Sequence, residues 1–451
     1  MLHFTTRSGN FRFRRISITF WTQNTGWVDI LLSQFSLATR AISWLRWLIH
    51  FRKAVVRKII YTLHLWIGLA SGLLVFIVAT TGAVQAFEED LRNWLQHKHL
   101  FVARNPSTAT HTATHTAALV KPSVVCATMQ RDASHEVIEQ IRFRYAASPV
   151  QPDSTNAEIP TFLVMTESDN IYSVHPQTGQ ILGVRNMTTD ALSIALELHT
   201  SLLLGRFGDA WYDVGEEIIK WNTLIFFVML ISGIILWMPM NMRLLKNAMR
   251  NSFRVRWNAS ASNAGIKRNY DLHRVAGFYA FGVMLIVAWT AIFWMFDAVE
   301  EGIYAFFGKK QTYLEKPKSF KPKENQDSVA VLSVPDRAMQ EITRFGEPYF
   351  VSLQLPKKKT DALRLVVRYP YRFLRKQSVF YFDQYSARLM KSDLHENYTT
   401  PDNVRVSNYD LHTGKMFGWA GKTLWLLAAL FTASLPVTGF LLWWKKRTAL
   451  R

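Results

Sequence analysis

The sequence predicts an α-helical membrane protein, in which two tandem repeats form a bundle of four transmembrane helices and carry two α+β domains on one side of the membrane. Three observations predict this fold class. Hydrophobic residues make up 49% of the 451 residues and gather in four long runs. Charged residues make up only 19%, below the roughly 25% that is typical of a soluble globular domain. Several short motifs also occur twice in the same order.

Each of the four runs is long enough, or nearly so, to cross a membrane as a helix, which takes about 20 apolar residues. They cover residues 63–87, 223–240, 275–296 and 423–444, and none contains a charged residue. Pro436 in the last run is compatible with a membrane helix, because neighbouring helices can satisfy the carbonyl group that it frees. Four buried helices of a soluble protein are the alternative.

Positively charged residues predict the orientation of these helices. The segment before the first run is rich in Lys and Arg and holds a single acid, Asp29, and the stretch between the second and third runs and the end of the chain are also basic. Such segments face the cytoplasm, so both termini are expected there. The predicted order is an N-terminal extension (1–57), transmembrane helices at 58–87, 212–240, 271–296 and 418–444, a cytoplasmic basic loop (241–270), two outer domains (88–211 and 297–417) and a cytoplasmic tail (445–451).

The net charge of +20 then reflects orientation and attraction to anionic membrane lipids, and we expect no nucleic-acid binding. Residues 27–51 are predicted to form an amphipathic helix on the inner leaflet; a non-functional extension is the alternative. The single cysteine, Cys126, excludes a disulfide within the chain and covalent cofactor attachment through a CxxCH motif.

Four histidines mark the repeat. His64 and His273 stand at the starts of the first and third runs, each within Tyr-x-Leu-His-x3-Gly. His199 and His412 precede the second and fourth runs, each within Leu-His-Thr-x4-Gly-x2-Gly. The length of chain from His64 to His199 is close to that from His273 to His412. The chain is therefore predicted to contain two copies of a unit made of a span, an outer domain and a second span.

The outer segments predict small α+β modules. Residues 172–182 and 380–390 both have the pattern strand, turn, strand. Gly179 supplies the positive φ of the first turn, and because Ala387 replaces it, we expect a different second turn. Residues 134–147 are predicted to form a helix capped by Ser134, and residues 105–123 and 315–328 to form linkers.

These motifs resemble the PepSY-associated transmembrane proteins. The segments that carry the resemblance are LHLWIGL from residue 63, VHPQTGQILG from residue 174, LHTSLLLG from residue 198, GIILWMP from residue 233 and LHTGKMFG from residue 411. The resemblance covers residues from about 58 to 447. It implies a bacterial inner-membrane protein with periplasmic PepSY-like domains, connected with iron uptake, in a family that includes haem-containing ferric-siderophore reductases.

The four histidines are the candidate cofactor ligands. Ionisable residues at membrane depth are costly and mark functional sites. The predicted topology places them in two layers, most of a membrane thickness apart, which excludes one tetrahedral metal site. Two imidazoles from different helices fit a haem in a helix bundle, so we expect two non-covalent haem b groups, one held by His64 and His273 and one by His199 and His412. Hydrogen-bonding or interfacial histidines are the alternative.

Gly68, Gly72 and Gly277 share a helix face with the inner histidines and are predicted to let a porphyrin approach the backbone. Helix–helix packing is the alternative role of these glycines.

The outer pair presents a problem of spacing. The chain from His199 to Gly233 is longer than the matching chain from His412 to Gly439. If both stretches were continuous helices, the excess of about two turns would leave the two rings about 10 Å apart in height. We therefore expect Gly205 and Gly208, with Gly418 and Gly421, to break the chain so that each His-Thr segment folds back. The sequence leaves open whether His97 or His99 replaces His199.

The resemblance predicts a ferric-siderophore or other ferric-chelate reductase, with Glu216 and Glu217 as candidates for a polar path. No Rossmann motif is present, so the electron donor is expected to be a separate reductase, a reduced flavin or a quinol. A haem-free PepSY protein that binds or regulates a periplasmic protease or uptake component is the alternative. A permease for the chelate is a third possibility, against which the four unbroken spans argue.

Overall fold

The computed structural model describes residues 26–103, 119–146, 158–239, 242–252, 254–257, 264–311, 313, 315–320 and 333–448, with no side-chain placement for 26–53, 242, 248, 251, 252 and 264. The chain divides into two compact units, Met1–Ile59 and Ile60–Arg451, and the following description concerns the second. Most of the predicted N-terminal extension and parts of both predicted linkers lie outside the described residues. Residues 26–53 are helical, and their placement on the inner leaflet stays a prediction.

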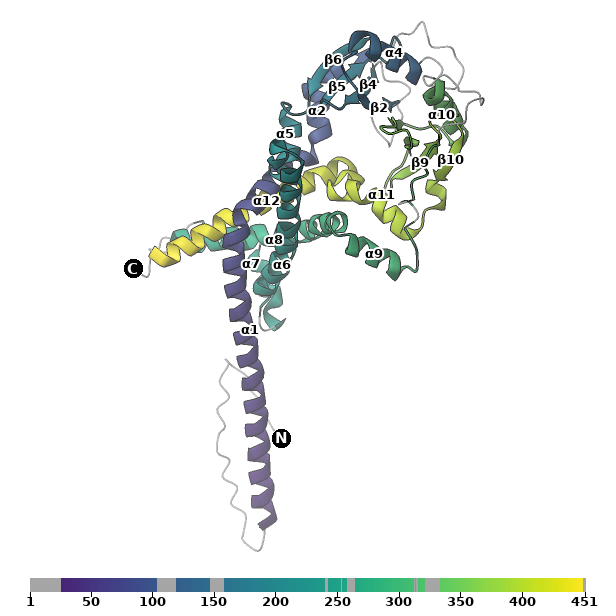
Figure 1. Ribbon diagram of the computed structural model, residues 1–451. Helices are drawn as coiled ribbons and strands as arrows, with labels where there is room; N and C mark the ends of the chain where they lie inside the picture. The colour runs from purple at the N-terminus through teal and green to yellow at the C-terminus, as the bar shows by residue number, and fades with distance from the viewer. Residues whose placement is uncertain are drawn as a thin grey trace. The chain divides into compact units, whose positions relative to one another are not determined.

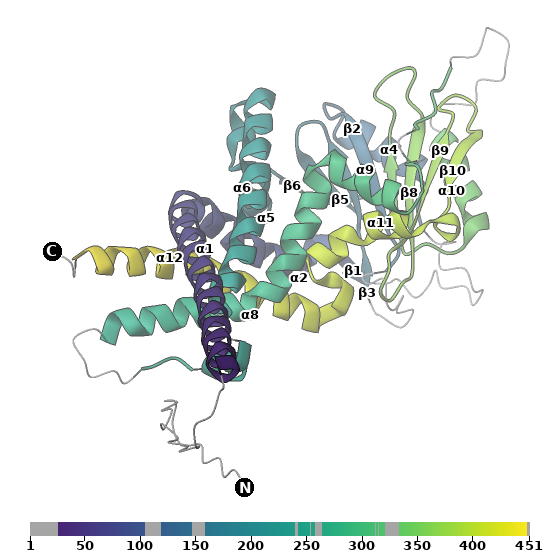
Figure 2. The same ribbon diagram turned by 90° about the horizontal axis from the view of Figure 1, so that it is seen from below.

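Four helices in the described parts of the chain are long and apolar enough to cross a membrane: Ala54–Ala86, Asp209–Trp237, Gly265–Met295 and Lys415–Thr448. They contain the four apolar runs of the sequence almost completely. The first is the end of α1 (Gly26–Ala86), the second is α6 (Asp209–Trp237), the third lies within α8 (Ala264–Met295), and the fourth is α12 (Gly418–Thr448) with the preceding 3₁₀ turn. Helices α8 and α12 lie side by side (Figure 2).

Shorter helices lie between the spans and around the strands. They are α2 (Glu88–Leu95), α3 (His97–Leu100), α4 (Pro122–Asp132), α5 (Ala191–Ser201), α7 (Leu245–Ser252), α9 (Asp297–Phe306), α10 (Val334–Ile342) and α11 (Thr400–His412). Local sequence signals explain several of their starts. Proline stands in the first turns of α4, α10 and α11, where its missing N–H is not needed. Thr399 and Asp402 form a capping box at the start of α11.

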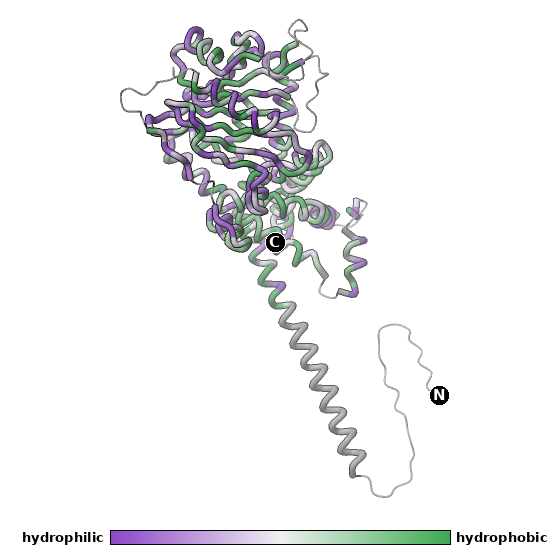
Figure 3. The backbone as a smooth tube through the Cα atoms, turned by 90° about the vertical axis from the view of Figure 1, so that its right-hand side faces the viewer, coloured by the Kyte–Doolittle hydropathy of each residue, from purple (hydrophilic) through white to green (hydrophobic). Residues whose placement is uncertain are grey.

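An eight-stranded antiparallel sheet forms the β part of the protein, in the order β10-β9-β8-β7-β2-β4-β5-β6. Its strands are β2 (Ile138–Arg144), β4 (Phe162–Thr166), β5 (Asn170–Val174), β6 (Ile181–Asn186), β7 (Phe350–Gln354), β8 (Leu363–Tyr369), β9 (Lys376–Phe382) and β10 (Leu389–Asp393). β1 (Phe101–Ala103) and β3 (Glu158–Pro160) form a separate antiparallel pair. The strands alternate between hydrophobic and hydrophilic residues (Figure 3), as expected when the two faces of a sheet differ.

The two predicted modules share this sheet instead of forming two separate sheets. β2 pairs with β7, so that Gln140 lies opposite Gln354 and Arg144 lies opposite Phe350. This pairing removes one exposed edge from each set of four strands. Helices α4 and α10 cover the same face (Figure 1), and buried residues of both halves form one hydrophobic core there. Ser123 on α4 donates to Asp336 on α10 through its backbone N–H, at 2.8 Å.

Two sequence expectations are wrong here. Residues 134–147 were expected to form a helix, but they contain β2. Ile141 and Phe143 point into the core while Arg142 and Arg144 lie on the other face, and this period of two is typical of a strand. The turn at Ala387 was expected to differ from the turn at Gly179. Both residues adopt positive φ, 59° and 75°, and both donate their N–H to the carbonyl four residues earlier.

Candidate functional site

The outer histidines meet in the structure. His199 lies in the last turn of α5, and His412 is the last residue of α11. Their ring centres are 6.5 Å apart, with an angle of 69° between the ring planes. Burial, followed by the nearby His199, lowers the pKa of His412 to about 4. Burial also lowers the pKa of His199, so both rings are neutral at pH 7.

The chain breaks that bring these histidines together are partly those expected. Gly208 has φ 115° and precedes α6, and Gly418 has φ 60° and begins α12. Gly205 instead lies in the 3₁₀ helix η2 (Leu204–Phe207), and Gly421 lies inside α12. In addition, Gly414 adopts φ 75° just before the 3₁₀ helix η8 (Lys415–Phe417). The expected chain breaks are therefore confirmed at Gly208 and Gly418, but not at Gly205 or Gly421.

The structure also explains why the two halves differ in spacing. Gly233 and Gly439 each lie near an inner histidine. The chain from Gly215 to Gly233 has the same length as the chain from Gly421 to Gly439. A Cβ atom on Gly215 would overlap the backbone carbonyl of Ser201, and one on Gly421 would overlap that of Gly414. The extra residues of the first half thus lie between its outer histidine and Gly215, in a longer turn and in the start of α6, and do not displace the outer ring.

The inner histidines each contact the following span. His64 on α1 lies 2.8 Å from the Ser232 hydroxyl of α6, measured from its Nδ1 atom. His273 on α8 lies 2.9 Å from the Thr438 hydroxyl of α12, again through Nδ1. The Cε1 atoms of these rings lie against Gly233 and Gly439, at 3.4 and 3.5 Å from where a Cβ atom would stand. His64 and His273 lie within electrostatic reach of each other.

The outer histidines have matching partners on the preceding span. The Nδ1 atom of His199 lies 3.1 Å from the Thr81 hydroxyl and 3.0 Å from the Val78 carbonyl oxygen, both on α1. The Nδ1 atom of His412 lies 2.9 Å from the Thr290 hydroxyl on α8. Each threonine follows the inner histidine of its own helix at the same spacing. At about 1.5 Å per residue, this spacing places the two histidine layers roughly 25 Å apart along the helices.

These contacts favour one position for the proton on each histidine ring. A hydroxyl group has one hydrogen to donate, and each of the four hydroxyls donates it to a carbonyl of its own helix. The acceptors are Ile77 for Thr81, Met229 for Ser232, Ile286 for Thr290 and Ser434 for Thr438, at 2.8, 3.0, 2.9 and 2.9 Å. When the hydroxyl hydrogen is donated along the helix, the hydroxyl oxygen accepts from histidine, which favours a proton on Nδ1. For His199, the Val78 carbonyl oxygen can only accept and therefore requires that proton. Nε2 is then left with a free lone pair, as a metal-ligating imidazole requires.

The sequence prediction included the histidines but missed the hydroxyl residues that hold them. A signal for them was present. Ser232-Gly233 and Thr438-Gly439 occupy the same place in the repeated motif that ends the second and fourth runs. Thr81 and Thr290 share their spacing from the inner histidines. Because hydroxyl residues are also common in ordinary helix packing, the pattern alone does not assign them to the histidines.

The other predicted residues do not contact the histidine pairs. A Cβ atom on Gly68 would lie 2.8 Å from the Met229 side chain, and one on Gly72 would lie 3.3 Å from Pro436. Gly277 faces Leu435 at 3.7 Å. These contacts favour helix packing as the role of the glycines.

The two candidate acids of the polar path are exposed on α6. Glu216 accepts from Tyr212, and Glu217 accepts from Lys220 and Trp221, all on the same helix. The predicted path therefore gains no support from a contact with either histidine pair. His97 and His99 lie elsewhere: His97 pairs with Glu158 at 3.1 Å, and His99 packs against Gly183.

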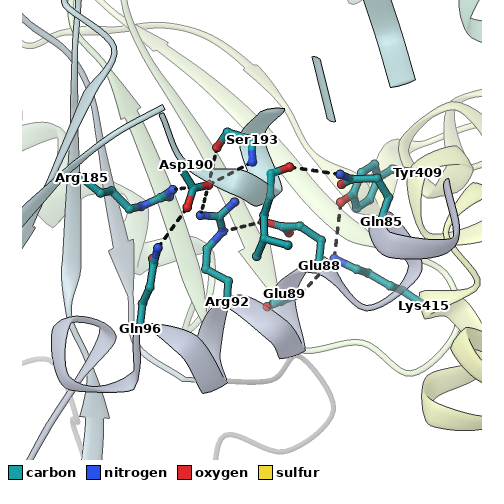
Figure 4. Close-up of polar contacts among 11 residues, drawn as sticks. Gln85, Glu88, Glu89, Arg92, Gln96, Arg185, Asp190, Ser193, Tyr409 and Lys415 are labelled. Carbon is teal, nitrogen blue, oxygen red and sulfur yellow. Dashed lines mark hydrogen bonds and ion pairs between the residues drawn. The ribbon is translucent and has the colours of Figure 1, made fainter. Parts of the chain in front are cut away.

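Ion pairs hold the outer ends of the spans together. Lys415 in η8 pairs with Glu89 on α2 at 3.0 Å, and Lys422 on α12 pairs with Asp90 at 2.6 Å. Arg92 on α2 pairs with Glu88 and with Asp190, the N-cap residue of α5 (Figure 4). Both segments that carry the outer histidines are thereby linked to α2.

In the described part of the chain, no group of three or more His, Cys, Asp or Glu is arranged to hold a metal ion; the histidines are grouped in twos. The four apolar helices identify a membrane protein. The family described as PepSY-associated TM region matches residues 61–446. The chain therefore belongs to this family, which confirms the resemblance found in the sequence. No curated protein matches the chain.

Proposed function

We propose that this protein is a di-haem b oxidoreductase of the bacterial inner membrane, which passes electrons across the membrane to reduce ferric iron bound by a siderophore or another chelator. The observation that carries the proposal is that Nδ1 of each of the four histidines lies within hydrogen-bond distance of a hydroxyl group on a neighbouring span. Hydrogen bonding of one ring nitrogen to a hydroxyl or carbonyl group orients the ring and leaves the other nitrogen available to a metal.

The residues of the outer pair fit an iron porphyrin. Two imidazoles that share one iron would each bind it through a ring nitrogen at about 2 Å, so their ring centres would lie only a few ångströms apart. The observed separation is 6.5 Å. His199 and His412 would hold one haem, and His64 and His273 would hold the other. Bound haem supplies the one-electron redox chemistry of its iron.

The chain's own contribution is to position, orient and shield these ligands. Thr81, Thr290, Ser232 and Thr438 keep Nδ1 protonated and turn each ring. Burial of the outer rings keeps them neutral, since a charged imidazole is disfavoured away from water. Buried alanines of α8, which include Ala280 and Ala288, pack between the two layers.

The proposal includes the finer topology. The two halves of the chain are tandem repeats, both termini are cytoplasmic, and the strand-bearing segments are periplasmic PepSY-like domains. Equal spacing from His64 to Thr81 and from His273 to Thr290 supports the repeat, and the basic segments support the orientation. The electron donor would be a separate reductase, a reduced flavin or a quinol, and the acceptor a ferric chelate.

Absorption spectroscopy tests the haem proposal. Protein purified in detergent from haem-replete cells is expected to contain about two haems per chain, measured as the pyridine haemochromogen, and to show low-spin bis-histidine spectra. His64→Ala and His412→Ala should each remove one haem. His135→Ala is the matched control, because the His135 side chain is 76% exposed and contacts neither pair.

Stopped-flow mixing of the dithionite-reduced protein with ferric chelates tests the acceptor, and reoxidation by at least one chelate is expected. A colourless preparation would refute the oxidoreductase proposal and favour the haem-free alternative, in which the protein binds or regulates a periplasmic partner. Haem without reoxidation by any ferric chelate would contradict iron reduction but not haem binding.

A further inference from the structure

Arginines gather on the face of the sheet that α4 and α10 leave uncovered. On β2, Arg142 and Arg144 alternate with the buried Ile141 and Phe143. On β8, Arg364 and Arg368 alternate with core residues in the same way. These arginines therefore lie on one face, beside a small apolar cluster of Val366, Val379 and Tyr381, while α4 and α10 cover the other, apolar face.

Three of these arginines lie close together across β7. Arg144 is paired with Phe350, which is paired in turn with Arg368. Their backbones are thus two strand spacings apart, roughly 10 Å, which lets both guanidinium groups reach one small ligand. Arg142 lies within electrostatic reach of Arg368. The guanidinium groups of Arg144 and Arg368 stack on Phe101 and Phe350, at 5.6 and 4.7 Å from the ring centres.

The carboxylates near this cluster already have partners. Glu88 and Asp190 pair with Arg92, and Glu89 pairs with Lys415 (Figure 4). Asp410 pairs with Arg375, whose Nε donates to it at 2.9 Å. Among the described residues, Arg142 and Arg144 make no ion pair and no side-chain hydrogen bond, and Arg368 donates only to the amide oxygen of Gln377.

The pKa shifts of the three arginines agree with their lack of ion pairs. Burial and the neighbouring Arg368 lower the pKa of Arg142, and burial lowers the pKa of Arg144. Burial and then Arg375 lower the pKa of Arg368. Glu88, Glu89 and Asp410 partly offset this effect on Arg142, Arg144 and Arg368, respectively, from a distance. None of these carboxylates forms an ion pair with the three arginines, so each guanidinium group is partly withdrawn from water without a directly paired anion, which is costly for the protein alone. Such strain is typical of a binding site, where a ligand supplies the missing charge.

We propose that Arg142, Arg144 and Arg368 bind a small anion that carries two or more oxyanion groups, either carboxylates or phosphates. Planar guanidinium groups donate paired hydrogen bonds to such groups. Phe101 and Phe350 hold two of the guanidinium groups in place from the side. The proposal does not depend on haem binding. It applies equally to a soluble polyanion, such as an anionic iron chelate, and to the phosphate of a lipid headgroup.

Isothermal titration with citrate and with inorganic phosphate tests the site, using the full-length protein in nanodiscs of neutral phosphatidylcholine. We expect binding in wild type, and at least about tenfold weaker binding in Arg142→Gln and in Arg368→Gln, because each loses charge-assisted hydrogen bonds. Arg388→Gln is the matched control, since Arg388 is exposed in the turn between β9 and β10 and the charge change is the same.

Thermal unfolding separates a binding role from a structural one. Without added anion, Arg142→Gln should unfold at the same temperature as wild type or at a higher one, because like-charge repulsion is relieved. With citrate, wild type should gain several degrees and the variant little. A variant that is less stable than wild type without anion, together with unchanged citrate binding, would overturn the proposal.

Nanodiscs that contain anionic phosphatidylglycerol distinguish the two sources of the anion. Citrate binding that is equal in neutral and anionic discs supports a soluble ligand. Citrate binding in neutral discs but not in anionic discs supports a lipid headgroup at the same arginines. Absence of citrate and phosphate binding in neutral discs, combined with no stabilisation of wild type by anionic lipid, would refute the site.

Discussion

The inner and outer histidine pairs share one hydrogen-bonding chemistry but are positioned in different ways. His64 and His273 are part of long spans, so the packing of those spans sets where their rings lie. His199 and His412 lie on the short helices α5 and α11, and each reaches its place through a turn with positive-φ residues. Two glycines, Gly215 and Gly421, then let those turns pack closely on the spans.

This difference has a physical consequence. The inner pair depends on apolar packing along whole helices, which is distributed over many residues. The outer pair depends on a few close backbone contacts and on ion pairs between α2, η8 and α12. The outer pair should therefore be the more sensitive of the two to single substitutions in the turns and at the ion pairs that position its helices.

Removal of a ligand should have the largest effect on either pair. If the proposed function is right, His412→Ala should leave about half of the haem, because the outer site would lose one of its two proposed ligands while the inner pair stays intact. His273→Ala should leave the other half, with a different reduction potential. A potentiometric titration followed at the α-band measures both variants. Loss of all haem from either one would show that the two sites do not assemble independently.

Substitution of glycine should disturb the outer histidine pair more than the inner one. A methyl group on Gly421 would overlap the carbonyl of Gly414, so Gly421→Ala should cost about 1–3 kcal/mol and displace His412. Gly439→Ala on the same helix meets His273 only at 3.5 Å and should have little effect. Gly282→Ala, which meets nothing within 4 Å, controls for helix propensity. Equal haem loss in the variants at 421 and 439 would contradict the comparison.

Much of this site could be predicted from the sequence, because its ligands lie in motifs that occur twice. The apolar runs predicted the four spans, since hydrophobic length is a direct requirement for crossing a membrane. The repeated Leu-His-Thr motif predicted that the outer histidines would pair. The hairpin at Gly179 was also predictable, because it depends on local turn chemistry.

What could not be predicted depends on contacts between distant parts of the chain. Residues 134–147 have a local pattern compatible with a helix, and only pairing with β4 and with β7, which lies in the second half of the chain, selects the strand β2. The turn at Ala387 repeats that at Gly179 although alanine disfavours positive φ, so the surrounding strands impose it. The four hydroxyl partners required the packing of the spans to be known.

Removal of the hydroxyl partners should produce a smaller difference in haem affinity between the two pairs. Ser232→Ala removes the hydroxyl that holds Nδ1 of His64, and loss of such a partner typically weakens metal binding by about 10–100-fold. Thr81→Val should weaken the outer site less, because the Val78 carbonyl still accepts from Nδ1 of His199 at 3.0 Å. Haem transfer to apomyoglobin measures both losses. A greater loss in Thr81→Val would show that the carbonyl does not substitute for the hydroxyl.

Acid should release the outer haem slightly before the inner one. Burial alone would raise the pKa of Glu89, but Lys415, Arg144 and Lys422 together hold it below the usual 4.5. The Glu89 carboxylate therefore stabilises the folded state fully above about pH 4.5, and this contribution is lost as the pH falls through the lowered pKa. Because the Glu89 side chain is 46% exposed, the effect is expected to stay below about 1 kcal/mol.

Glu89→Gln tests this acid sensitivity, since the variant keeps the shape of the side chain but carries no charge at any pH. Its outer haem should be held less firmly than that of wild type at pH 7, and the two proteins should converge as the pH falls below 4.5. Acid titration in the stopped-flow spectrometer, followed at the α-bands of the two haems, measures the order of release. Earlier release of the inner haem in wild type would mean that ion pairs around α2 do not limit the outer site, and that the turns at Gly208 and Gly414 hold it without their help.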